Sequence, residues 1–389
     1  MGERSRQIDQ VYEAIGAFAE WALTDGVTAP GDADFLFGNP HEVATAAYVS
    51  ALRDALEPTG PDHYAYTMSD PAATESVAAG LTERFGVTFD AADITMTNGN
   101  FAGLAIVLRT IADPGDEIIY VSPPWFFYET LIVAGGMTPV RVRADATTMD
   151  LDVAAITAAI TPKTRAVIVN SPHNPSGRIY PAARLDELAA SLEEASRAND
   201  RLIYLVSDEA YNRIVFDDRT FPTPTVHYPH SFLLYTYAKT LLAPGSRLGY
   251  IAMPSTMDER EALRMPLVLA TIATGWAFPV STLQQAVPAL ERLPPPLAAL
   301  QRRRDVICST LTEEGYELIV PEGTFYVLTR SPLPDDRAFC DRLSAHGVHV
   351  LPGAMFEMPG WFRISLTADD DMVERALPVF AKAIDEVRG

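Results

Sequence analysis

The segment RAVIVNSPHNPSG, residues 165–177, joins the pattern of a buried strand to that of a rigid turn. Its first half, Arg165–Asn170, is a nearly continuous apolar run, which is typical of a strand covered on both faces. The two prolines and the glycine that follow fix a turn. Asn174 stands between the prolines, so its side chain is a preorganised hydrogen-bond donor at the end of the strand. An ordinary turn has the same composition, so the rest of the chain is needed to distinguish a functional asparagine from a plain turn.

Strand patterns of the same kind recur on both sides of this segment and alternate with helical stretches such as Asn100–Ala112 and Ala182–Ala198. This alternation predicts an α/β fold. Its large domain, residues 45–285, is expected to contain a mostly parallel seven-stranded sheet covered by helices. The other six expected strands are Ile94–Thr97, Glu117–Ser122, Thr138–Arg143, Leu202–Ser207, Phe232–Tyr237 and Leu248–Met253.

The two ends of the chain have a different pattern. The prolines of residues 293–296 interrupt the chain, and helices then alternate with only two clear strands. We therefore expect a smaller α+β domain built from residues 1–44 and 286–389, on which the N-terminal helix, Ile8–Ala22, could pack. The expected elements of the tail are the helices Leu297–Glu314, Asp335–His346 and Asp370–Val387 and the strands Phe325–Thr329 and Phe362–Leu366.

Composition and charge narrow the class of function. The chain has 389 residues and a formal net charge of −21, which disfavours nucleic acid and anionic membranes as partners. The two cysteines, Cys308 and Cys340, have no metal-ligand spacing and favour a reducing cytoplasm, and no metal site is expected. Neither a signal peptide nor a membrane span is recognisable. An acidic protein that binds an anion must, however, have a local positive site that overcomes the repulsion from its own net negative charge.

Lys239 is the first candidate for chemistry, because it follows directly on an apolar strand pattern. Burial favours the neutral, nucleophilic form of a lysine amine. Taken alone, a lysine at a strand end is more often an ordinary surface residue. Its neighbours change the interpretation, since the hydroxyl of Thr236 and the planar guanidinium of Arg247 suit the oxygens of a phosphate.

Two further strings stand at the ends of expected strands. Asp208, with Tyr211 three residues later, follows a buried strand, and a carboxylate there can pair with a protonated ring nitrogen. An acidic residue before a helix is equally typical of an N-cap. Residues 98–101, Asn-Gly-Asn-Phe, precede a helix, where Gly99 lets the backbone approach an anion closely. An Asn-Gly pair alone is also a common turn.

Taken together and in this order, the strings resemble the fold-type I pyridoxal-phosphate enzymes, specifically the class I and II aminotransferases related to aspartate aminotransferase. The resemblance extends from Gly38 to Arg363. It implies that Lys239 is the catalytic residue and holds pyridoxal phosphate as a Schiff base. It further implies that Asp208 bonds the pyridine nitrogen of the cofactor.

The resemblance also implies roles for the other candidate residues. Tyr66, with Tyr64 as the alternative, corresponds to a tyrosine that reaches the phosphate of a partner subunit, so a homodimer with shared sites is expected. Gly38 and Arg363 correspond to the groups that bind the substrate carboxylate, next to Asn174 and Trp125. The remaining cofactor-binding residues are Asn174 and Tyr211 at the ring oxygen, Trp125 stacked on the ring, Gly99, Asn100, Thr236 and Arg247 around the phosphate, and Phe101.

Three features depart from the family pattern. Ala238 stands where a serine is usual, and the stretch after Tyr66 lacks the common glycine and Leu-Arg pair. Residues 271–279 contain no arginine that could bind a second substrate carboxylate, and they include Trp276. Together with the aromatic residues 125–127, this favours a neutral or aromatic amino acid over a dicarboxylic one. The expected reaction is transfer of the amino group between an L-amino acid and a 2-oxo acid.

Two alternatives stay open from the sequence. The same lysine, aspartate and arginine serve fold-type I enzymes that perform β-elimination, decarboxylation or oxidation. A non-catalytic regulatory domain is the other alternative, although the chain carries no helix-turn-helix extension and no basic patch.

Overall fold

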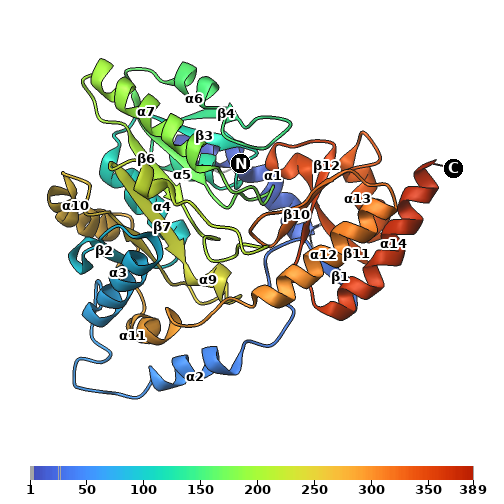
Figure 1. The fold of residues 1–389 in the computed structure, drawn as a ribbon, viewed down its shortest axis with the longest axis horizontal. Coiled ribbons are helices and arrows are strands. Elements are labelled where there is room, and N and C mark those ends of the chain that lie inside the picture. Colours follow the sequence, from blue (N-terminus) through green and yellow to red (C-terminus); the bar gives the residue numbers. More distant parts are fainter. Residues whose placement is uncertain (1–3, 25, 27, 389) are drawn as a thin grey trace.

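The computed structural model describes residues 4–24, 26 and 28–388, and it contains two sheets with their covering helices (Figure 1). The large sheet has the strand order β2-β8-β7-β6-β5-β3-β4. Only β8 runs antiparallel to its neighbours, so the mostly parallel seven-stranded sheet is confirmed. Its strands are β2 (Ile94–Thr97), β3 (Glu117–Ser122), β4 (Thr138–Arg143), β5 (Thr164–Asn170), β6 (Tyr204–Asp208), β7 (Ser231–Thr236) and β8 (Gly249–Ala252).

Helices cover both faces of this sheet, because successive strand residues point to opposite sides and both sets are apolar. In β5, Ile168 packs with the helices of one face and Val167 and Val169 with those of the other. The first face is covered by α4 (Asn100–Ile111), α5 (Tyr128–Ala134) and α10 (Arg260–Ala273). The second is covered by α6 (Val153–Ala159) and α7 (Ala182–Ala198) at one end and by α2 (Ala46–Asp54), α3 (Pro71–Phe85) and α11 (Ser281–Leu290) at the other. Short elements are η1 (Ala91–Asp93), α8 (Pro224–His227) and α9 (Tyr237–Thr240).

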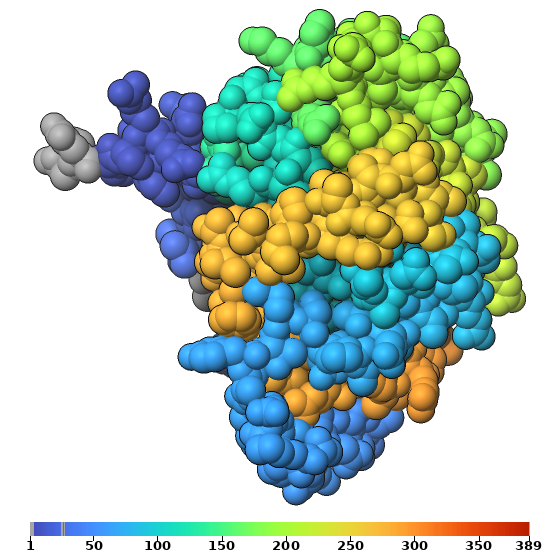
Figure 2. Space-filling model, turned by 90° about the vertical axis from the view of Figure 1, so that its left-hand side faces the viewer, coloured from blue at the N-terminus to red at the C-terminus, as the bar shows by residue number. Residues whose placement is uncertain are grey.

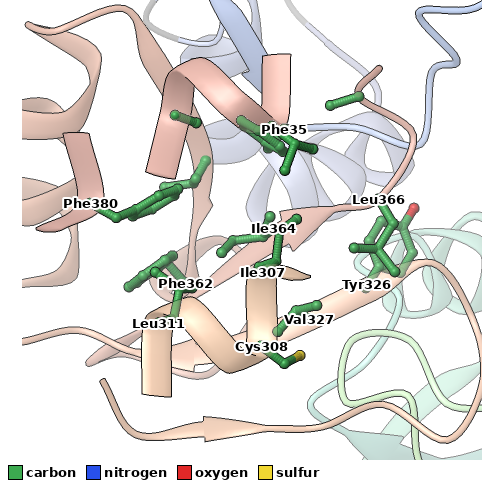
Figure 3. Close-up of a cluster of buried hydrophobic side chains, with 14 of the residues drawn as sticks. Phe35, Ile307, Cys308, Leu311, Tyr326, Val327, Phe362, Ile364, Leu366 and Phe380 are labelled. Atoms are coloured by element: carbon green, nitrogen blue, oxygen red, sulfur yellow. The ribbon is translucent and has the colours of Figure 1, made fainter. Parts of the chain in front are cut away.

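The second sheet has the order β1-β11-β12-β10-β9 and combines both ends of the chain, since β1 pairs in parallel with β11. Three helices pack on it, and Figure 3 shows Phe35, Phe362 and Phe380 meeting in the resulting core. Its strands are β1 (Ala33–Phe35), β9 (Leu318–Ile319), β10 (Tyr326–Arg330), β11 (Val348–Pro352) and β12 (Trp361–Ser365). The helices are α12 (Leu297–Glu313), α13 (Asp336–Ser344) and α14 (Asp370–Arg388), with η2 (Gly353–Phe356) between β11 and β12.

The N-terminal helix α1 (Arg6–Thr24) does not belong to the small domain alone. Gln7 Nε2 donates a hydrogen bond to the carbonyl oxygen of Ala134 in α5, at 2.5 Å. The ring of Phe18 stacks on Phe126 beside α5 with centroids 4.1 Å apart, and its edge meets Phe37 at 6.3 Å. Helix α1 therefore bridges the two halves of the molecule, and the domain boundaries at 44/45 and 285/286 remain predictions.

Two strand ends differ from the expected ones in a way that affects the site. Asp208 is the last residue of β6 rather than the residue after it, and Lys239 lies in the single-turn helix α9 rather than at the tip of β7. Among the described residues, no helix is long and apolar enough to span a membrane.

Candidate active site

An open cavity lies where the carboxyl ends of β5, β6 and β7 meet. This is the edge at which open α/β sheets bind ligands. The cavity brings together nine residues that the sequence analysis selected from widely separated strings. They are Asn100, Phe101, Trp125, Asn174, Asp208, Tyr211, Thr236, Lys239 and Arg247.

Lys239 projects from α9, whose first turn is capped by Thr236. The Thr236 hydroxyl accepts a hydrogen bond from the backbone nitrogen of Ala238 at 3.3 Å, so β7 passes directly into the helix. The Nζ atom lies 5.6 Å from the ring centroid of Phe325, and the side chain is partly exposed to the cavity. Lys239 has no ion-pair partner in the part of the chain that the structure describes, so its side chain is available to a ligand in the cavity.

Asp208 is held at the bottom of the cavity by two side chains. Its Oδ1 accepts a hydrogen bond from Asn100 Nδ2 and its Oδ2 accepts one from the hydroxyl of Tyr128, each at 2.5 Å. Burial raises the pKa of Asp208, while the hydrogen bonds from Tyr128 and Asn100 oppose that shift. A buried carboxylate of this kind is stabilised in its charged form by a cation placed beside it, such as a protonated ring nitrogen.

The structure adds two contacts to the sequence-based expectation. Asn100 is expected at the phosphate, and that role stays a prediction, while its side-chain amide faces Asp208. Tyr128 was not selected at all, although it holds Asp208 as closely as Asn100 does. Its position three residues after Trp125 gives no local signal of this contact, because the two partners are 80 residues apart in the sequence.

The turn of residues 170–177 places Asn174 between the two ends of the site. Asn170 donates from Nδ2 to the carbonyl oxygen of Asp208 and accepts at Oδ1 from the backbone nitrogen of Asn174, both at 2.8 Å. Asn174 Oδ1 in turn accepts from Arg363 Nη1 at 2.9 Å. The side-chain nitrogen of Asn174, Nδ2, therefore remains as the donor for a ligand oxygen.

Arg363 is a buried cation without a counter-ion among the described residues. Its side chain comes from β12 of the small sheet, only 3% of the residue is exposed, and Nη2 donates to the carbonyl oxygen of Leu36 at 3.0 Å. The ring of Tyr326 lies 3.8 Å from Cζ, and Nε is buried without a partner in the described chain. Burial lowers the pKa of this guanidinium, and an anion beside it would stabilise its charge.

Gly38 is needed beside Arg363 for space. A Cβ atom at this position would lie 2.6 Å from the ring of Phe325 and 2.8 Å from the hydroxyl of Tyr326. Any side chain here would displace Tyr326, whose ring covers the guanidinium of Arg363. The residue thus shapes the carboxylate end of the site without contributing a side chain.

Gly99 and Arg247 form the opposite, anion-binding end. Gly99 is the N-cap of the twelve-residue helix α4 and has a φ of 80°, a conformation that glycine adopts readily. A Cβ at Gly99 would lie 3.0 Å from Arg247 Nη2, so the missing side chain lets the guanidinium approach the free backbone N–H groups of the helix. Burial lowers the pKa of Arg247, which again favours binding of an anion.

Aromatic rings form one wall of the cavity. Trp125 meets Phe101 edge-on at 5.4 Å and Phe127 at 5.1 Å between centroids. Trp276 lies outside the cavity, but its carbonyl oxygen accepts a hydrogen bond from Asn98 Nδ2 at 2.7 Å, next to the anion-binding end. The wall gives a planar ligand a stacking surface.

Tyr66 and Tyr64 do not reach the cavity of their own chain. Tyr66 is 88% exposed and Tyr64 is 59% exposed. The ring of Tyr66 packs on Phe278 with centroids 5.0 Å apart. Any contact of these tyrosines with a cofactor therefore requires a second chain.

The residues present fit pyridoxal phosphate. The site offers an amine, a buried carboxylate, a ring-stacking wall and an anion-binding end, each suited to a different part of that molecule. Two buried polar atoms, Asn100 Oδ1 and Arg363 Nε, lack hydrogen-bond partners within the described chain, as expected of a site that awaits polar ligands.

Comparison with known proteins agrees with this geometry. Residues 32–380 match the family model described as "Aminotransferase class I and II". The chain is 31% identical over 357 residues to the aspartate/prephenate aminotransferase of Thermus thermophilus, covering 90% of this chain and 88% of the relative. It is 30% identical over 363 residues to the arginine–pyruvate transaminase of Pseudomonas aeruginosa, covering 90% of each. A solved amino transferase from Eubacterium rectale superposes with a TM-score of 0.88 at 28% identity, covering 100% of this chain and 97% of the other.

Proposed function

Since the chain belongs to the class I and II aminotransferases, and is therefore a pyridoxal-phosphate-dependent transferase, we propose that it moves the amino group of neutral or aromatic L-amino acids to a 2-oxo acid. The names of the relatives support amino transfer and not the lyase alternative. The observation that carries the proposal is the contact of Arg363, a buried guanidinium with no counter-ion in the described chain, with Asn174 of the cavity that Lys239 also lines.

The cofactor is held by groups at both ends of the cavity. Gly99, Arg247 and Thr236 would hold the phosphate, and the Asp208 carboxylate would stabilise a proton on the ring nitrogen. When bound, pyridoxal phosphate supplies an aldehyde that links to amines and a cationic ring that withdraws electrons from the substrate Cα. Trp125 stacks on the ring and fixes its plane.

The chain's own residues then orient the substrate and move a proton. Arg363 would bind the substrate carboxylate through its planar guanidinium and so orient the substrate Cα. The Lys239 amine would carry the cofactor and serve as the base that holds and moves the Cα proton. Asn174 Oδ1 accepts a hydrogen bond from Arg363, and its side-chain Nδ2 would donate to the ring oxygen of the cofactor.

The preference for neutral or aromatic side chains rests on what lines the cavity. Among the described residues that line it, the basic side chains are Lys239 and Arg247, to which the roles of base and phosphate ligand are assigned, and Arg363 adjoins it at Asn174 as the ligand of the α-carboxylate. The rings of Phe101 and Trp125 present apolar surface to the cavity, and Phe127 packs on Trp125. A dicarboxylic substrate would have to bury its second carboxylate there without a cation, which costs several kilocalories per mole.

A panel of amino acids tests this preference. In single-turnover reactions, phenylalanine and leucine should convert the bound cofactor to its amine form with rate constants roughly 10- to 100-fold above those of aspartate, the range that apolar pockets discriminate. The 2-oxo acid product should appear in equal amount. An aspartate rate constant equal to or above that of phenylalanine would contradict the proposed substrate class.

We further propose that the enzyme is a homodimer with shared sites. Helix α10 exposes Met265, Leu269 and Ile272 on one face, by 62%, 58% and 53%. The segments that carry α10, Tyr66 and Phe278 adjoin one another on the side of the molecule shown in Figure 2. An apolar face of this extent on a chain with a net charge of −21 is suited to a second copy, which would bring Tyr66 to the partner's phosphate.

Sedimentation tests the dimer. The wild-type protein is expected to sediment with the mass of two chains. Leu269→Asp should give monomers and reduce amino transfer at least about 10-fold, because a buried unpaired charge opposes association. Val320→Asp is the matched control, since Val320 is 55% exposed and lies elsewhere, on the small domain. A monomeric and fully active wild-type protein would contradict the proposal.

A further inference from the structure

Glu357 occupies a backbone conformation that favours glycine. It terminates η2 with a φ of 63°, in the left-handed region that residues with a side chain rarely adopt. Three residues later the same loop uses Gly360 for a φ of 84°. A glutamate retained in such a conformation points to a function of its side chain.

The Glu357 carboxylate joins the two halves of the molecule. Its Oε2 accepts a hydrogen bond from Ser122 Oγ at 2.7 Å, and its Oε1 lies 2.9 Å from Arg141 Nη2. Glu357 belongs to the loop between β11 and β12 of the small sheet, whereas Ser122 and Arg141 are the partners on β3 and β4 of the large sheet. We call this contact of Glu357 with Ser122 and Arg141 the latch, because it joins the small sheet to the large sheet.

Charged groups from each neighbouring element surround this latch. Arg141 also pairs with Glu129 of α5 at 3.0 Å and donates from Nε to the hydroxyl of Tyr120 at 2.9 Å. Glu13 of α1 lines the same cleft. Burial raises the pKa of Glu357, while the hydrogen bond from Ser122 and the charge of Arg141 oppose the shift. The side chains of Glu357 and Arg141 are 23% and 46% exposed, so the latch remains within reach of water.

On both sides of the latch, the chain leads to a residue of the candidate active site. On the large sheet, Ser122 leads through two prolines to Trp125, which lines the cavity. On the small sheet, Glu357 precedes β12, which carries Arg363, and the ring of the adjacent Phe356 lies 6.0 Å from Arg363 Cζ. The spacing between the carboxylate-binding arginine and the stacking ring thus depends on this contact.

We propose that Glu357 is a positioning residue that sets the spacing between Arg363 and Trp125 during amino transfer. The inference rests on the proposed function. Glu357 acts through its neighbours and not on the substrate, so its loss should weaken substrate binding more than it slows the chemical step. Small errors in the placement of binding groups have large kinetic effects.

Glycine substitution separates positioning from stability. Glu357→Gly removes the latch and relieves the left-handed backbone, so the melting temperature should be unchanged or higher. The KM for the amino acid should rise about 10-fold with a much smaller change in kcat. Asp200→Gly is the matched control, because Asp200 also has a positive φ, 46°, but lies on the large domain away from the cavity. Its kinetic constants should equal those of the wild type.

Glu357→Gln gives a second measurement that a merely structural role would not affect. In the wild type, kcat/KM should fall as acid protonates Glu357 and weakens its contact with Arg141. The glutamine variant should have a raised KM at neutral pH and lack this acid-side decrease. Wild-type KM and pH profiles in both Glu357 variants would overturn the proposal. A wild-type protein that performs no amino transfer would instead overturn the proposed function.

Discussion

Replacing Lys239 with alanine is expected to reduce amino transfer by about 10⁴-fold or more, because both the covalent link to the cofactor and the proton transfer at Cα depend on this amine. The fold should tolerate the change. Lys239 is partly exposed, forms no ion pair in the described chain and lies in a single-turn helix whose cap is provided by Thr236. Lys239→Arg should be similarly inactive, since a guanidinium does not lose its proton at neutral pH.

The composition of the chain makes this test unusually direct. Lysine occurs only at positions 163, 239 and 382, and the first and last of these are exposed. Reduction of the protein with borohydride in the presence of pyridoxal phosphate should therefore label one peptide, the one containing Lys239. Lys163→Ala and Lys382→Ala serve as controls and should keep both the label and the activity. A label that persists in Lys239→Ala at full turnover would refute the assigned role.

The large sheet could be predicted from sequence because its signals are local. The strands β2, β3 and β4 begin and end at the expected residues. In β2 and β3 nearly every residue is buried, as their apolar runs predict, whereas β4 is an edge strand in which Val142 alone is fully buried. Strand ends next to the site were placed less well. Asp208 and Lys239 lie at transitions where backbone hydrogen bonds with distant neighbours, and not the apolar pattern, decide where the strand stops.

For the candidate site, the sequence predicts the role of each short motif separately, but not how the motifs contact one another. The cavity does gather Lys239, Asp208, Asn174 and Arg247. How their side chains contact one another was beyond the sequence, because those contacts join distant segments. Asn100 turns its amide to Asp208 across 108 residues of sequence. The same limit applies to Glu357, whose partner Ser122 is 235 residues away.

Arg363 is the residue whose replacement should best separate function from stability. Arg363→Leu is expected to reduce kcat/KM for amino acids about 10³-fold, because a buried, two-pronged contact with a carboxylate is lost. Phenethylamine, which resembles phenylalanine without its carboxylate, should react equally slowly with both proteins. The kcat/KM of Arg363→Lys should lie between those of the wild type and of Arg363→Leu, since lysine keeps the charge but lacks the planar guanidinium. The ratio of the phenylalanine and phenethylamine rates therefore measures the carboxylate contact alone.

The melting temperatures of these variants distinguish a binding role of Arg363 from a structural one. Removing Arg363 relieves a buried charge that has no counter-ion in the described chain, and this gain offsets the two lost hydrogen bonds, so the melting temperature should stay near that of the wild type. Arg304 is equally buried, 4% exposed, but pairs with Asp217 at 2.7 Å. Arg304→Leu should therefore lower the melting temperature and leave kcat/KM unchanged. If Arg363→Leu instead unfolds readily and keeps its preference for phenylalanine over phenethylamine, Arg363 is a structural residue and the carboxylate binds elsewhere.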